Sequence, residues 1–220
     1  MHYCKRSMNL STFIYLVLIL SIPYFWYIRH STVPKKGFSL LFSGIISIAL
    51  LIRFNLVVFI ALVILLSVLT HEKKLISDFS FLISFLILIY DSFSLLESSL
   101  VASFLPIMLV SGIFSLMMIG HWFLVDPTIT RIGMKNIARS SMFIASLLCL
   151  LMIAGLISPE ISSFYKNIIL GLYISSAVLS LGSLKSLNET SYTGVMAATG
   201  LSYLSLLVSL GGTGTLILLP

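Results

Sequence analysis

The stretch that decides the fold is residues 38–70, FSLLFSGIISIALLIRFNLVVFIALVILLSVLT, which is apolar except for Arg53, Asn55 and a few hydroxyl groups. As one helix it would be about 49 Å long and would hold Arg53 near the centre of a bilayer. An arginine at that depth costs at least about 2.5 kcal/mol. A turn at Arg53-Phe54-Asn55 moves the charge to the membrane surface instead. We therefore predict two short helices here. One long helix, which leaves seven in the chain, is the alternative.

The same apolar character continues over the rest of the chain. Mean hydropathy is +1.14, 59% of the 220 residues are hydrophobic and only 9% are charged, whereas a soluble domain carries about 25% charged residues. The bilayer core offers no water to backbone polar groups, so each apolar run must form a helix. The sequence predicts an all-α, polytopic transmembrane helical bundle of about eight short helices, in a single transmembrane domain over residues 1–220. The predicted segments are 9–28, 38–52, 55–70, 75–92, 99–124, 140–158, 163–184 and 194–218.

The basic residues predict the orientation of this bundle, because loops rich in Lys and Arg stay in the cytoplasm. The eight-helix arrangement puts nine of the 13 basic residues on one side and four on the other. Both chain termini then lie outside, in a plasma or inner membrane. The seven-helix alternative also gives a skewed count, so charge alone does not fix the helix number. The larger set is Arg29, Lys35, Lys36, Lys73, Lys74, Arg131, Lys135, Arg139 and Lys185, and the smaller set is Lys5, Arg6, Arg53 and Lys166.

The formal net charge of +6 is explained by these loops. Loop cations set topology and contact anionic lipid headgroups. We therefore expect the lipid bilayer and other membrane subunits as partners, and no nucleic acid.

An internal echo predicts a weak parallel repeat of four plus four helices. The run Trp26-Tyr27-Ile28 precedes a basic loop and a serine-containing apolar segment, and Trp122-Phe123-Leu124 does the same. The two repeat units would be about residues 9–95 and 99–218, in the same orientation. Apolar sequences resemble one another by composition, so two unrelated halves are the alternative.

His121 is the best candidate for a functional polar residue. It lies in the apolar run MIGHWFLV, residues 118–125, and an ionisable residue inside a span indicates function by default. Its imidazole could bind a redox cofactor or a metal ion, or transfer protons. Trp122 and Thr199 are candidate companions, because Thr199 and the following glycine could admit a cofactor against this helix. Haem is one such cofactor, although it normally needs two facing histidines and only His121 lies deep enough in the sequence pattern.

Two groups of charged residues are further candidates. Arg131, Lys135 and Arg139 recur every four residues and so share one helical face. That face, on a short interfacial helix from Pro127, could bind phosphate or anionic headgroups; an ordinary basic surface is the alternative. Before it, Asp126 is expected to form an Asx-type turn.

The second group is a predicted structural ion pair. Asp91 and Glu97 fall at the turn between the fourth and fifth segments, on the same predicted side as Arg53. Asp78 falls near the start of the fourth segment.

The chain holds no G-x-S-x-G, H-E-x-x-H, Walker or acidic metal motif, so no catalytic residue and no enzyme activity is predicted. Three functions stay open. The first is a membrane subunit or a small-ligand or redox-cofactor-binding protein with His121 as its key residue. The second is a small transporter or permease, which would show a polar cavity lined by both halves, with Asp91 or Asp78 facing inward. The third is a structural subunit of a larger complex, which would show a wide apolar face and no cavity.

Overall fold

The structure is a computed structural model that describes residues 8–31, 36–70, 74–95, 100–157 and 161–218. Within these ranges the chain forms eight α-helices and no strand, which confirms the predicted all-α bundle. The helices are α1 (Leu10–Ser31), α2 (Lys36–Ile52), α3 (Leu56–Thr70), α4 (Lys74–Leu95), α5 (Leu100–Val125), α6 (Arg131–Ile153), α7 (Ser163–Ser186) and α8 (Tyr192–Leu218).

Five of these helices, α1, α5, α6, α7 and α8, are long and apolar enough to cross a membrane. A span needs about 20 apolar residues at 1.5 Å rise per residue. The apolar helices α2 and α3 are shorter, at 17 and 15 residues. The helices are thus those of a multi-pass membrane protein.

The break inside residues 38–70 is present, so the eight-helix prediction is confirmed over the long-helix alternative. α2 ends at Ile52 and α3 begins at Leu56. The side-chain oxygen of Asn55 accepts a hydrogen bond from the backbone N–H of Val57 at 3.3 Å. This bond satisfies one of the N–H groups that a helix start leaves without an intrahelical partner.

The start of α6 corrects one prediction. We expected a separate interfacial helix from Pro127 and a membrane segment from residue 140, but one continuous helix begins at Arg131. The hydroxyl of Thr130 caps it by accepting from the N–H of Gly133 at 3.2 Å. The predicted Asx turn is present, because the Asp126 carboxylate accepts from the N–H of Thr128 at 3.3 Å and from its hydroxyl at 2.7 Å.

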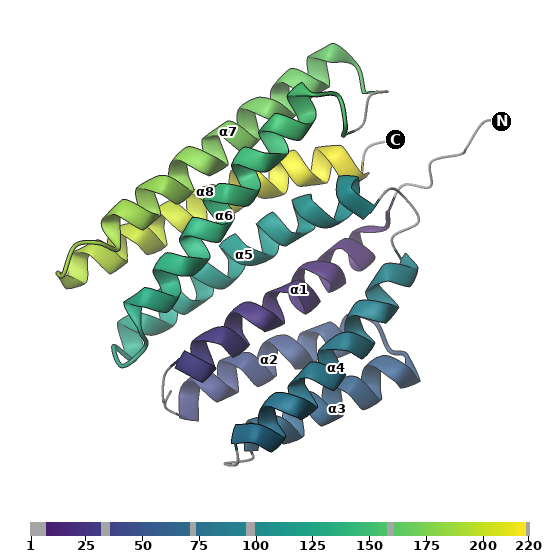
Figure 1. Ribbon diagram of the computed structural model, residues 1–220, viewed down its shortest axis with the longest axis vertical. Helices are drawn as coiled ribbons and strands as arrows, with labels where there is room; N and C mark the ends of the chain where they lie inside the picture. The colour runs from purple at the N-terminus through teal and green to yellow at the C-terminus, as the bar shows by residue number, and fades with distance from the viewer. Residues whose placement is uncertain (1–7, 32–35, 71–73, 96–99, 158–160, 219–220) are drawn as a thin grey trace.

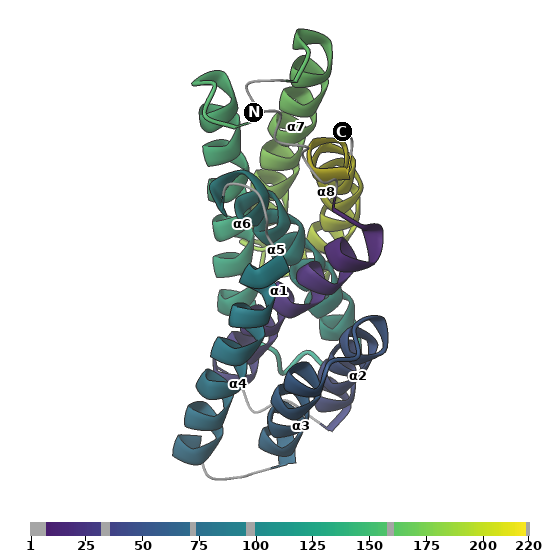
Figure 2. The same cartoon turned by 90° about the vertical axis from the view of Figure 1, so that its right-hand side faces the viewer.

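The helices form two groups of four, α1–α4 and α5–α8, with α1 and α5 at the centre of the molecule (Figures 1 and 2). α1 packs against both α5 and α6 and is the main link between the groups. Within each group the first helix contacts the second and the fourth, and the third contacts the second and the fourth. Any up-and-down group of four helices gives this order, so the internal repeat stays a prediction.

Small and hydroxyl-bearing residues bring α8 close to its neighbours. The hydroxyls of Ser176 on α7 and Ser205 on α8 lie 3.1 Å apart. Gly120 of α5 faces Thr199 of α8 so closely that an added Cβ would overlap the threonine hydroxyl. Interhelical hydrogen bonds and close backbone approach are the forces that hold helices together in lipid.

The Gly120 contact predicts the effect of one added methyl group. Gly120→Ala should lower the free energy of unfolding by about 1–3 kcal/mol, because Thr199 must move out of a filled space. The control is Gly200→Ala, since a Cβ there meets nothing within 4 Å. Thermal unfolding in detergent measures both variants. Equal melting temperatures for the two variants would contradict the close packing of α5 on α8.

Candidate functional site

His121, Trp122 and Thr199 do not converge on one site. His121 is exposed on the outer surface of α5, while the Trp122 ring packs on Gly37 at the start of α2. Thr199 is buried against α5, and its hydroxyl donates to the backbone oxygen of Val195 at 2.8 Å. Successive helix residues point about 100° apart, so neighbours along α5 face different parts of the molecule.

The described residues contain no group of three or more His, Cys, Asp or Glu side chains that could hold a metal ion. His30, in the last turn of α1, lies 3.5 Å from a carboxylate oxygen of Asp78 on α4. This geometry does not support a metal or haem site at His121. A groove elsewhere in the bundle is a better-defined candidate site.

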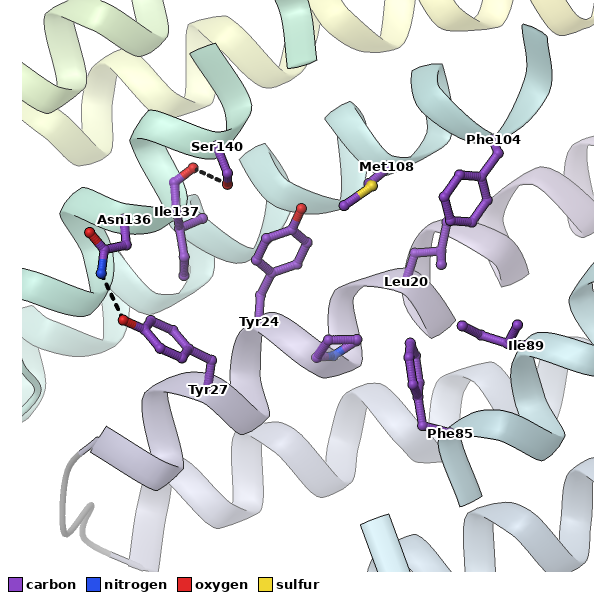
Figure 3. A pocket seen from close by; sticks show the side chains of 11 residues that line it. Leu20, Tyr24, Tyr27, Phe85, Ile89, Phe104, Met108, Asn136, Ile137 and Ser140 are labelled. Carbon is purple, nitrogen blue, oxygen red and sulfur yellow. Dashed lines mark hydrogen bonds between the residues drawn. The ribbon is translucent and has the colours of Figure 1, made fainter. Parts of the chain in front are cut away.

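The candidate site is a groove between α1, α4, α5 and α6, with a volume of about 470 Å³ (Figure 3). It lies between the two four-helix groups and takes side chains from both. This volume falls in the usual range for small-molecule sites, about 300–1,000 Å³. The groove is lined by Leu20, Pro23, Tyr24, Tyr27, Phe85, Ile89, Phe104, Met108, Asn136, Ile137 and Ser140.

Polarity changes along the groove. Leu20, Phe85, Ile89, Phe104 and Met108 line one end, and the polar side chains gather at the other (Figure 3). Along α1, Leu20 and Tyr27 are about 10 Å apart at 1.5 Å per residue. By the same measure the polar end is about 6 Å, and the apolar end about 16 Å, from the end of α1 at Ser31. The groove therefore runs from near the end of α1 at Ser31 toward the middle of that helix.

A chain of hydrogen bonds forms the polar end. The amide nitrogen of Asn136 donates to the hydroxyl oxygen of Tyr27 at 2.7 Å. The guanidinium of Arg139 donates to the amide oxygen of Asn136 at 3.3 Å. Tyr27 and Arg139 are both exposed, so this chain marks the mouth of the groove.

Tyr24 lines the groove with its ring. Its hydroxyl oxygen is buried beside Gly112 of α5 and close to Ser140 of α6. The Ser140 hydroxyl donates to the backbone oxygen of Ile137 at 2.8 Å. The Tyr24 hydroxyl therefore belongs to the contact between α1, α5 and α6, and the polar groups at the groove mouth are those of Tyr27 and Asn136.

The three basic residues of α6 make different contacts. Arg131 donates to the backbone oxygen of Glu189 at 2.7 Å, with its guanidinium 5.4 Å from the centre of the Phe123 ring. It therefore fastens the α7–α8 turn to α6. Lys135 is half-buried on the next turn. Arg139 alone of the three bonds to a residue that lines the groove.

A second polar cluster lies at the opposite end of α1. Nε of Arg53 donates to a carboxylate oxygen of Asp91 at 3.2 Å, and the hydroxyl of Tyr15 donates to the same oxygen at 3.2 Å. Asp91 is buried, with 8% of its side chain exposed. It lies inside α4, which continues to Leu95 beyond the predicted end at residue 92. Glu97, the other expected partner, lies outside the described residues.

The groove residues were missed by the sequence analysis. No functional role was predicted for Tyr24, Asn136 or Ser140, and Tyr27 was named only as part of the internal echo. The available signal was their periodicity, because positions 20, 23, 24 and 27 share one face of α1. Nothing in the sequence indicates which helix that face meets.

Comparison with known protein families, with curated proteins and with solved structures gives no match.

The Asp91 cluster predicts a strong dependence of stability on one carboxylate. Asp91→Ala leaves the Arg53 guanidinium and the Tyr15 hydroxyl without this acceptor, and should lower the free energy of unfolding by about 2–3 kcal/mol. Asp78→Ala is the control, because the Asp78 side chain is 40% exposed and such pairs contribute at most about 1 kcal/mol. Denaturant unfolding in detergent measures both. A smaller loss for Asp91→Ala than for Asp78→Ala would contradict the structural role of the cluster.

Proposed function

We propose that this protein is a multi-pass membrane protein that binds a small amphiphilic molecule in the groove between α1, α4, α5 and α6. The observation that carries the proposal is the groove itself, which has an apolar lining and a few polar groups at one end. Ligand sites in proteins are mostly apolar clefts with a small number of placed polar groups. The key polar residues of this proposal are Tyr27 and Asn136 instead of His121.

The alternatives are less well supported by the same observation. A proton-coupled transporter would need Asp91 or Asp78 in the cavity, but Asp91 bonds to Arg53 and Tyr15, and neither carboxylate lines the groove. A purely structural subunit would not need a cavity between its halves. A membrane subunit that binds its own lipid or cofactor remains compatible with the groove.

The proposed location is the plasma or inner membrane, with both termini outside. The start of α1 and the end of α8 lie at the same end of the bundle (Figure 1). The basic side chains Arg29, Arg131, Lys135 and Arg139 lie at or near the other end, where the mouth of the groove also lies. The positive-inside rule assigns that end, and the mouth, to the cytoplasmic leaflet.

Filling the groove tests the proposed function. We expect the wild-type protein to co-purify with a bound amphiphile. Ile89→Trp places a larger ring in the apolar end of the groove and should remove it. Leu86→Trp is the matched control on the same helix, because Leu86 is 56% exposed and does not line the groove. Native mass spectrometry from mild detergent measures bound small molecules. Equal occupancy in Ile89→Trp, Leu86→Trp and wild type would overturn the proposal.

Labelling of single cysteines tests the proposed orientation. In a variant without Cys4 and Cys149, Asn55→Cys should react with a membrane-impermeant maleimide in intact cells, because the α2–α3 turn is outside. Lys185→Cys, at the opposite end, should react only after the membrane is permeabilised. The reverse pattern would place the groove mouth in the outer leaflet.

A further inference from the structure

We propose that the occupant of the groove is a single-chain lipid with a phosphate-bearing headgroup, its chain between α1, α4 and α5 and its phosphate at Arg139, Asn136 and Tyr27. This inference rests on the proposed function and adds the chemical class of the ligand. It is carried by three properties of the groove: its direction across one leaflet, the donors at its mouth and the sign of the charge there.

The direction of the groove matches a lipid lying in one leaflet. The apolar end, at Leu20 and Ile89, lies beside the middle of α1, and the polar end lies toward the end of α1 at Ser31. If α1 crosses the bilayer as one span, these ends correspond to the bilayer centre and the headgroup region. A ligand with this polarity keeps the alignment of a bilayer lipid when it enters. It therefore exchanges with the membrane without moving its polar group through hydrocarbon, which would cost several kcal/mol.

The donors at the mouth fit a phosphate group. Arg139 uses one N–H group for Asn136, and a guanidinium has five N–H donors in a planar fork that suits phosphate oxygens. The Tyr27 hydroxyl accepts from Asn136, so its own proton is directed toward another acceptor.

The charge at the mouth favours an anion. Arg139 is exposed on α6 and Lys135 lies one turn earlier on the same helix. The two described acidic residues of α4 have partners elsewhere, since the Asp91 carboxylate bonds to Arg53 and Tyr15 and the Asp78 carboxylate lies at His30. Cationic side chains near a membrane surface attract anionic headgroups, and charge-assisted hydrogen bonds are about twice as strong as neutral ones.

The test compares two lipids that differ only in the phosphate, a monoacylglycerol and the corresponding monoacylglycerol phosphate. Binding to the purified protein is titrated by native mass spectrometry from an uncharged detergent. We expect the phosphate lipid to bind about tenfold more tightly, which corresponds to one charge-assisted contact. Arg139→Gln should abolish this preference, because the phosphate lipid loses its charge-assisted contact. Lys185→Gln is the matched control, because Lys185 is exposed and does not line the groove.

The outcomes separate this inference from the proposed function. Equal affinity for the two lipids, with both excluded by Ile89→Trp, would overturn the phosphate inference and leave the groove as an amphiphile site. Binding of both lipids unaffected by Ile89→Trp would overturn both proposals. Displacement of the phosphate lipid by excess inorganic phosphate, with monoacylglycerol still bound, would identify free phosphate as the ligand and overturn the lipid assignment. Tyr27→Phe should weaken only the phosphate lipid.

Discussion

Inside a bilayer, a charged side chain or a backbone carbonyl finds no water, so every polar group in the spans needs a protein partner. The buried carboxylate of Asp91 shows how this constraint acts. Its oxygen receives hydrogen bonds from Arg53 and Tyr15, which come from different parts of the first four-helix group. The bond from Arg53 also explains why the chain turns where it does, because the arginine reaches its acceptor from the α2–α3 turn and not from the middle of a helix. Serine hydroxyls follow the same rule and donate to carbonyls of the preceding turn or to the neighbouring helix.

This constraint is also what made the fold predictable. The lengths of the apolar runs predicted the helices, and the cost of burying Arg53 predicted the turn that separates α2 from α3. The start of α6 was placed too late because Arg131, Lys135 and Arg139 suggested a surface segment. In the structure, Thr130 caps one continuous helix, and the three basic residues occupy its first turns. Helix boundaries depend on caps as well as on hydropathy.

The candidate site could not be predicted in the same way. His121 was predicted to be functional because it is ionisable and has apolar neighbours in the sequence. Its position along the helix, however, does not determine which way its side chain points within the bundle. The groove instead depends on how α1 packs between α4, α5 and α6, and that contact joins residues more than a hundred positions apart, such as Tyr27 and Asn136. The same placement links the groove to the arrangement of the two halves. Because both halves line it, a ligand that fits one arrangement better stabilises that arrangement.

The short helices α2 and α3 have a consequence for the surrounding membrane. The 15 residues of α3 extend about 23 Å, while the 26 residues of α5 extend about 39 Å. The molecule is therefore thin along the edge formed by α3 and thick through its centre. Where α3 meets a bilayer, the neighbouring lipids compress to match its shorter length, at a cost of a fraction of a kcal/mol per Å of mismatch.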